Sequence, residues 1–212
     1  MKIDNYSLTV KGKTLIENSN LSFYSGTINH IVGKNGVGKS QLAKDLVLNN
    51  SGNVPKNISS KSTLISSSSS VPEDITKDFL LKLLKNKFSR SEDLFSNIYQ
   101  ILDIDSIPSR VLIKNLSDGQ KQKLKFLSFL LEDNQLVILD EVTNALDKKT
   151  VTEIQEFLNI FIKEHPNKTI INITHNLSDL KNIPGKYFAL QDRGIQEYQS
   201  MSSSRIILLP VN

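Results

Sequence analysis

A glycine-rich stretch between an apolar segment and an amphipathic one constrains the fold of this chain more than any other feature. Residues 33–40, GKNGVGKS, fit the pattern G-x-x-x-x-G-K-[ST] of a phosphate-binding loop. Glycines let the backbone curl so that successive N–H groups point at phosphate oxygens, and the following helix adds its positive N-terminal end. The pattern therefore predicts a nucleoside triphosphate site, with the Lys39 ammonium on the β- and γ-phosphates and the Ser40 hydroxyl on Mg²⁺.

The flanking segments give this loop a context that a chance glycine-rich turn would lack. Residues 28–32 before it, INHIV, predict a short strand, and the residues after it predict a helix to about Leu48. Leu42, Leu46 and Val47 give that helix an apolar face to pack on a sheet. A strand, a phosphate-binding loop and a helix together indicate the α/β class.

The composition excludes several other classes of protein. The 212 residues can bury a sizeable core, and none is a cysteine, so disulfides and thiolate metal sites are excluded. No apolar run approaches the roughly 20 residues of a membrane-spanning helix, and the N-terminus has no signal-peptide pattern. If the protein acts at a membrane, we therefore expect a partner to supply the spanning part.

The positive charge is concentrated around the predicted phosphate site. Residues 1–65 hold eight lysines and three acidic residues, a formal charge of +5. Such a basic lobe suits a nucleoside triphosphate, while an anionic lipid surface, nucleic acid and an ordinary solvated surface stay open as alternatives. Residues 72–115 carry seven basic and seven acidic residues, so nothing there marks a nucleic-acid surface. We therefore expect no nucleic-acid partner.

Two further polar groups are expected at the same edge of the sheet as the loop. Residues 136–139 are all apolar, which is typical of a central strand in a parallel sheet, and they lead directly into Asp140 and Glu141. Because parallel strands present ligand groups at their carboxyl ends, Asp140 is placed to hold Mg²⁺, directly or through water. A second apolar strand, 168–174, ends at His175, a position that favours a functional histidine over an ordinary surface one.

Two helix starts are also marked in the sequence. Ser117, followed three residues later by Gln120, forms a capping box. Apolar residues from Leu124 onward go most of the way round this helix, so we expect it to be largely buried, with its N-terminus facing outward. Asp147 starts an amphipathic helix that ends before Pro166.

The remaining segments complete an α/β chain with a helical insertion. We expect an antiparallel hairpin from residues 3–10 and 14–23, a loop at 49–62, a strand at 63–65, helices within 72–115, a hairpin from 186–190 and 195–198, and an apolar tail at 206–211. The five serines at 66–70 have low-complexity composition, and a flexible linker is an open alternative to a loop that contacts a partner.

The order of these motifs resembles one family, the ATP-binding cassette (ABC) ATPases that drive ABC transporters. GKNGVGKS is similar to the Walker A loop, LSDGQ (116–120) to the LSGGQ signature, LVILDE (136–141) to Walker B, NALD (144–147) to the D-loop, and His175 to the switch histidine. The resemblance extends from Ile3 to about Tyr198. Many NTPases share a phosphate loop, but this combination of motifs is highly specific.

The resemblance implies a fold and a function. The fold would be a single ABC ATPase domain over residues 1–212: a P-loop NTPase core with a mostly parallel central sheet, an antiparallel β subdomain, and an α-helical subdomain inserted at about 72–116. The function would be that of an ATP-hydrolysing subunit powering transport through separate transmembrane subunits. The protein would be cytoplasmic and peripheral on the cytoplasmic face of the membrane.

The resemblance also implies a shared site. Two cassettes, identical or different, would meet head to tail, with each ATP between the Walker A loop of one and the signature of the other. The nucleotide-binding residues would be Gly33, Lys34, Asn35, Gly36, Val37, Gly38, Lys39, Ser40 and Gln41 of one cassette and Ser117, Gly119 and Gln120 of the other. Glu141 would polarise the attacking water, His175 would contact the γ-phosphate, and Ser40 and Asp140 would hold Mg²⁺.

Four positions depart from the family's pattern. Gln41 stands where a second hydroxyl residue is usual, and Asp118 puts a carboxylate where the signature has glycine. The Q-loop glutamine should fall near residues 66–70, which are all serine. Val10 stands near the place of the aromatic that stacks on adenine, and Tyr6 is a candidate substitute.

Three functions follow from this reading. The leading one is the ATPase subunit of an ABC transporter. The second is a soluble ABC-type ATPase that is not coupled to transport. The third is a degenerate cassette that binds ATP but hydrolyses it poorly, an alternative that Asp118 and the missing Q-loop glutamine keep open.

Overall fold

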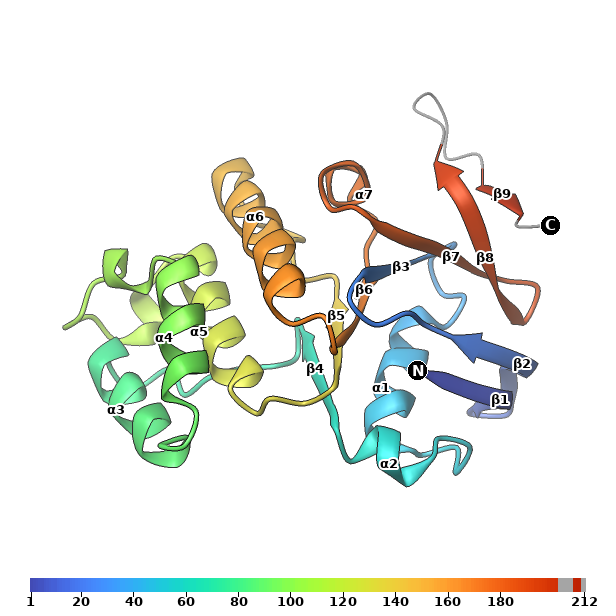
Figure 1. Ribbon diagram of the computed structural model, residues 1–212, viewed down its shortest axis with the longest axis horizontal. Coiled ribbons are helices and arrows are strands. Elements are labelled where there is room, and N and C mark those ends of the chain that lie inside the picture. Colours follow the sequence, from blue (N-terminus) through green and yellow to red (C-terminus); the bar gives the residue numbers. More distant parts are fainter. Residues whose placement is uncertain (202–207, 211–212) are drawn as a thin grey trace.

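Seven strands form the central sheet, in the order β4-β5-β6-β3-β7-β8-β9 (Figure 1). The computed structural model describes residues 1–201 and 208–210. The strands are β3 (Ile28–Val32), β4 (Ser62–Ser66), β5 (Leu136–Asp140), β6 (Thr169–Ile173), β7 (Gly185–Gln191), β8 (Gly194–Met201) and β9 (Leu208–Pro210). Strands β4, β5, β6, β3 and β7 run parallel to one another, and β8 and β9 extend the sheet with antiparallel pairing. The carboxyl ends of β3, β5 and β6 therefore meet at one edge, which confirms the mostly parallel sheet.

Strands β3, β5 and β6 are buried along their whole length, and β5 shows how an apolar strand packs on both faces. On β5, Leu136 and Ile138 pack with Leu42 and Leu46 of the first long helix in one apolar cluster. Val137 and Leu139 point the other way, into a second cluster that contains Phe157 of a long helix on the opposite face. Alternate residues of β5 thus pack into two different cores, which explains why all four positions from 136 to 139 are apolar.

A separate two-stranded sheet covers the edge of the core. It consists of β1 (Lys2–Val10) and β2 (Lys13–Ser22), paired antiparallel as the sequence predicts. The turn between them has two residues in the left-handed region, Lys11 at φ 50° and Gly12 at φ 77°. The Glu17 amide donates to the Arg193 carbonyl at 2.9 Å, which ties β2 to the turn between β7 and β8.

Three of the described helices form a group apart from the β1–β2 hairpin (Figure 1). The helices are α1 (Lys39–Leu48), α2 (Lys56–Ser59), α3 (Lys77–Lys87), α4 (Glu92–Ile101), α5 (Asp118–Leu130), α6 (Lys148–Glu164) and α7 (Leu177–Asn182), with short 3₁₀ turns η1 (Ile104–Ser106) and η2 (Ile113–Asn115). Figure 1 shows α3, α4 and α5 gathered at the end of the molecule away from the β1–β2 hairpin. Helix α5 joins this group to α6, because the Phe126 ring packs against Phe157 with 5.5 Å between centroids.

Two predictions need correction or restriction. The loop predicted at 49–62 is interrupted by α2, a single turn that Pro55 starts by accepting from the Ile58 amide at 2.9 Å. The apolar tail predicted at 206–211 lies partly outside the described residues, and Leu208–Pro210 of it form β9. Within the described part of the chain, no helix has the length and apolar character needed to cross a membrane.

Candidate nucleotide site

The phosphate-binding loop connects β3 to α1 and needs glycine at two places. At Gly38 the backbone has φ 118°, and a Cβ atom would lie 3.1 Å from the Leu15 side chain of the hairpin. At Gly33 a Cβ atom would lie 2.6 Å from the carbonyl oxygen of Leu190 on β7. The loop is therefore wedged between the hairpin and the central sheet, with no room for a side chain at either position.

The Lys39 ammonium is held over the inside of the loop. Its Nζ donates to the carbonyl oxygens of Gly33 at 2.8 Å and Lys34 at 3.1 Å. Burial lowers the pKa of Lys39, and the nearby carboxylates of Glu141 and Asp140 act in the opposite direction. A cation fixed in the concavity of a phosphate-binding loop is suited to meet a triphosphate.

Oxygen ligands for a divalent cation lie at the start of α1 and the end of β5. The Ser40 hydroxyl donates to Oδ1 of Asp140 at 3.1 Å, and burial raises the pKa of Asp140. Within residues 1–201 and 208–210, no group of three or more His, Cys, Asp or Glu side chains forms a metal cluster. One carboxylate and one hydroxyl fit Mg²⁺, which commonly takes its other ligands from phosphates and water.

Glu141 and His175 are brought into contact at the edge of the sheet. The His175 Nε2 atom lies 3.0 Å from Oε1 of Glu141, and the Asn144 side-chain amide donates to Oε2 at 2.8 Å. Glu141 itself is in the left-handed region, with φ 56°. Its amide donates to the Ile173 carbonyl of β6 at 2.9 Å, which helps to hold this unfavourable backbone. The carboxylate is thus fixed by partners on both sides.

A cavity of about 640 Å³ collects most of these groups, a size that suits a small-molecule ligand. Its wall includes Asn35, Gly36, Gly38, Lys39, Ser40, Gln41, Glu141, Asn144 and His175. Val10, Lys11 and Lys13 of the hairpin close the other side. Lys11 and Lys13 are not among the site residues predicted from the sequence, although the basic turn at 11–13 is a signal for them.

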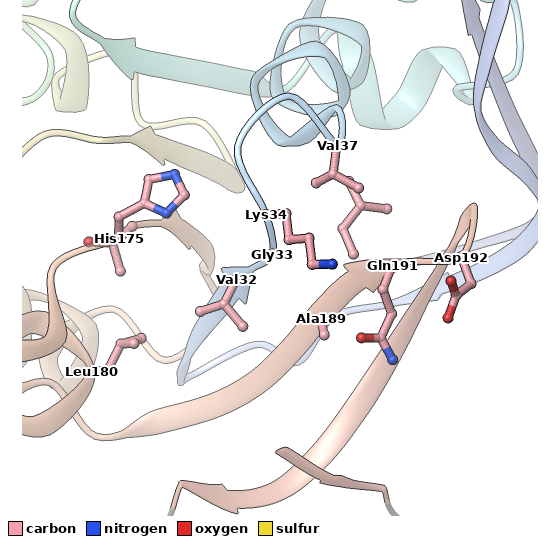
Figure 2. A pocket seen from close by; sticks show the side chains of 11 residues that line it. Val32, Gly33, Lys34, Val37, His175, Leu180, Ala189, Gln191 and Asp192 are labelled. Atoms are coloured by element: carbon pink, nitrogen blue, oxygen red, sulfur yellow. The ribbon is translucent and has the colours of Figure 1, made fainter. Parts of the chain in front are cut away.

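A second hollow of about 790 Å³ lies on the other side of the loop (Figure 2). Gly33, Lys34 and Val37 line this hollow and do not line the first one. Figure 2 shows the Lys34 side chain reaching into it, with His175 on one side and Gln191 and Asp192 on the other. Because His175 borders both hollows, it and the loop form the wall between them.

The comparisons with known proteins agree with this geometry. The family model described as "ABC transporter" matches residues 16–144. The chain is 58% identical over 201 residues to the probable peptide export ATP-binding protein YydI of Bacillus subtilis (strain 168), covering 95% of each chain. This chain belongs to the ABC transporter family. It is an ABC-type ATPase, the ATP-binding subunit of an ABC transporter.

Solved ABC structures share the fold. The ABC protein cbiO1 from Clostridium perfringens matches with a TM-score of 0.73 at 20% identity, over 92% of this chain and 85% of that one. A bacterial Atm1-family ABC exporter with ATP bound matches with a TM-score of 0.72 at 19% identity, over 92% of this chain and 37% of that one. This confirms the predicted ABC cassette fold.

The ABC signature lies apart from the two hollows at the loop. None of the residues 117–120 lines either of them. The predicted capping box is present: the Ser117 hydroxyl accepts from the Gln120 amide at 3.3 Å, and the Gln120 side chain accepts from the Ser117 amide at 3.1 Å. A Cβ atom on Gly119 would lie 2.5 Å from the Thr150 hydroxyl on α6, so glycine is required by packing there. Ser117 and Asp118 face solvent, as predicted.

The serine run forms a hydrogen-bonded turn at the end of β4. Ser66 is the last residue of β4 and pairs with Asp140. The Ser69 amide donates to the Ser66 carbonyl at 3.1 Å, and the Ser69 hydroxyl donates to the Leu64 carbonyl at 3.0 Å. The Lys125 ammonium of α5 donates to the same Ser66 carbonyl at 3.2 Å. The Q-loop place is therefore filled by a turn anchored to the signature helix.

Tyr6, the candidate substitute for the aromatic that stacks on adenine, does not lie at the cavity. Tyr6 is fully buried, and its hydroxyl donates to Oδ2 of Asp45 at 2.6 Å. Its ring therefore packs in the core and cannot stack on a base in the cavity. Val10 does line the cavity, so an adenine ring there would meet an aliphatic side chain.

Proposed function

We propose that this ABC ATPase powers the export of a peptide through separate transmembrane subunits, acting on the cytoplasmic face of the membrane. The observation that carries the proposal is the 58% identity to a probable peptide export ATP-binding protein, over 95% of both chains. Identity at this level without large gaps in coverage supports a shared cargo class.

The proposed catalytic groups are Glu141 and His175. Glu141 would orient and polarise the attacking water, since its carboxylate accepts from Asn144 and contacts His175 and so has a fixed direction. His175 would contact the γ-phosphate from its position in the cavity wall. Ser40 and Asp140 would hold Mg²⁺, which when bound supplies charge neutralisation for the phosphates. The chain's own contribution is therefore positioning and electrostatics.

We further propose that two cassettes, identical or different, form the complete ATP site. The exposed Ser117 and Asp118 at the N-terminus of α5 support this, because the signature is free to meet the nucleotide of a second cassette. Asp118 shares a hollow with Lys121, Lys125 and Glu73, and the Lys121 ammonium lies 3.6 Å from the Glu73 carboxylate. The degenerate alternative, in which Asp118 weakens the contact with the partner's nucleotide, therefore stays open.

Peptide secretion by the host cell tests the cargo and the coupling together. We would replace Glu141 by Gln in the chromosomal copy and compare the peptides in the culture medium with those of the parent strain by mass spectrometry. We expect at least one peptide to disappear from the medium and to return when the original residue is restored. Unchanged secretion, together with ATPase activity of the purified chain, would point to an ATPase that is not coupled to peptide export.

A further inference from the structure

A buried carboxylate on α7 lies behind the candidate catalytic groups. Asp179 is only 1% exposed. Its Oδ2 accepts from the Thr143 hydroxyl at 2.6 Å and the Thr174 hydroxyl at 2.7 Å, and its Oδ1 accepts from the Gln155 amide at 2.8 Å. All three donors are neutral, and burying a carboxylate is costly, so its retention calls for an explanation.

The two threonines belong to the segments that carry the groups around Glu141. Thr143 immediately precedes Asn144, whose amide donates to Oε2 of Glu141 at 2.8 Å. Thr174 immediately precedes His175, whose Nε2 lies 3.0 Å from Oε1 of Glu141. One carboxylate oxygen of Asp179 therefore connects the segments on both sides of the Glu141 side chain.

The segment around Thr143 needs such an anchor. Glu141 and Ala145, which flank it, are both in the left-handed region, with φ 56° and φ 61°. Residues other than glycine pay a conformational cost there and stay only where their surroundings hold them. Thr143 is only 3% exposed, and its hydroxyl donates to Asp179, a residue outside its own segment.

Helix α6 fixes the other oxygen of the carboxylate. Besides Oδ1 of Asp179, the Gln155 amide donates to the Ser178 hydroxyl at 2.9 Å. The Gln155 carbonyl in turn accepts from the Asn182 side chain at 2.9 Å. Gln155 cannot turn its amide over without losing these bonds, so position 179 must offer an acceptor toward α6 and an acceptor toward the two threonines.

We propose that Asp179 is a positioning residue, which sets the contact between Glu141 and His175 by bridging Thr143 and Thr174. Asp179 is not among the residues that line the two hollows at the phosphate-binding loop, so it would act through Thr143 and Thr174. The inference rests on the proposed roles of Glu141 and His175 in hydrolysis.

The test is Asp179→Asn, which keeps the shape but places an amide donor against either Gln155 or the threonines. We expect turnover to fall about ten- to a hundredfold, with the Kd for ATP within about twofold of the original. Adding Gln155→Glu reverses the donor and the acceptor at that contact, and this double variant should recover most of the activity. Thr174→Val, which removes one donor, is the milder variant should Asp179→Asn fold poorly.

Tyr6→Phe is the matched control, because it removes a buried hydroxyl–carboxylate bond of the same 2.6 Å length, which joins β1 to α1. It should leave turnover unchanged. A second readout is independent of turnover: the chain has three histidines, so the imidazole NMR signals of His175 can be assigned. Asp179→Asn should move the His175 signals in the way that Glu141→Gln does, and Tyr6→Phe should not.

The outcomes separate the two levels of the proposal. If Glu141→Gln slows turnover but Asp179→Asn leaves both turnover and the His175 signals unchanged, the positioning role is wrong and the proposed function stands. If Glu141→Gln turns over as fast as the original chain, the assigned role of Glu141 in hydrolysis is wrong. The His175 signals then still decide whether Asp179 sets the contact.

Discussion

The hydroxyl of Ser40 donates to Oδ1 of Asp140 at 3.1 Å, across 100 residues of sequence. This contact joins the first turn of α1 to the end of β5, so the two oxygen ligands proposed for Mg²⁺ are adjacent before any ligand binds. It also counteracts burial, which raises the pKa of Asp140, because a hydrogen bond to the ionised carboxylate lowers it.

The first prediction follows from that balance. A raised pKa means that protons compete with Mg²⁺ for Asp140 at higher pH than for an exposed aspartate. Ser40→Ala removes a proposed Mg²⁺ ligand, which should lower the affinity for Mg²⁺ at every pH, and it also removes a hydrogen bond that lowers the pKa of Asp140. The loss of Mg²⁺ binding on acidification should therefore begin at a higher pH in the variant. The measurement is the Mg²⁺ concentration that gives half-maximal ATP binding, at several pH values. If Mg²⁺ binding is lost over the same pH range in the two proteins, Asp140 is not the titrating ligand.

A second prediction concerns the affinity for ATP. Lys39→Ala should remove a charge-assisted contact worth roughly 1.5–3 kcal/mol, which is about ten- to over a hundredfold in Kd. Titration with a fluorescent ATP analogue measures this. Lys56→Ala, on the exposed surface of α2, is the control for loss of one positive charge. Equal affinities of the Lys39 variant and the original chain would mean that the loop is not the site.

Third, Glu141→Gln should separate binding from hydrolysis. The amide keeps the size of the side chain but cannot accept a proton, so turnover should fall by a factor on the order of 10² or more while ATP affinity is kept. A dimer peak in gel filtration with Mg-ATP should become easier to see. An original chain with no measurable turnover, and a variant that matches it, would favour the degenerate cassette.

The fourth prediction distinguishes neighbouring serines in the turn. Ser69→Gln breaks the bonds from its hydroxyl to the Leu64 carbonyl and from the Ser66 amide to that hydroxyl, both 3.0 Å long. We expect it to cost about 1–2 kcal/mol, or roughly 2–8 °C in Tm. Ser67→Gln is the control, since Ser67 is exposed and lines the hollow beside Asp118. Equal Tm values for the two variants would mean that the hydrogen bonds of Ser69 do not hold the turn.

In the same pair of variants, Mg-ATP hydrolysis with membrane subunits tests the coupling role. Glutamine at position 67 should raise hydrolysis more than glutamine at 69, because only the former projects from an intact turn. If neither substitution has an effect, the serine run does not serve as the Q-loop.

Much of the fold was predictable because its signals are local. The strand before Asp140 is a short apolar run followed by two carboxylates, and the capping box at Ser117 is complete within four residues. By contrast, β3 lies between β6 and β7, an order that no local pattern encodes. The serine turn was ambiguous because its composition suits a linker, whereas its hydrogen bonds depend on the sheet edge beside it.

The residues of the candidate site also divide into those with a local signal in the sequence and those whose partners lie far along the chain. The loop, Asp140, Glu141 and His175 each lie in or beside a recognisable motif. Asp179 does not, because its partners Thr143 and Gln155 lie 36 and 24 residues away. The ring of Tyr6 makes it a candidate for adenine stacking in the sequence, but its hydroxyl is bonded to Asp45, 39 residues further along the chain, a partner that no local pattern indicates.

The contact between Gly119 and Thr150 has a mechanical consequence. The Thr150 side chain at the start of α6 fills the place that a Cβ atom on Gly119 would take, so the starts of α5 and α6 pack closely. The Thr150 hydroxyl donates to Oδ2 of Asp147 at 2.6 Å, and Asn144, three residues earlier, lines the cavity and holds Glu141. A displacement of α5 is therefore transmitted through residues 144–147 to the carboxylate at the cavity wall, so the helical end of the molecule works as a lever on that carboxylate.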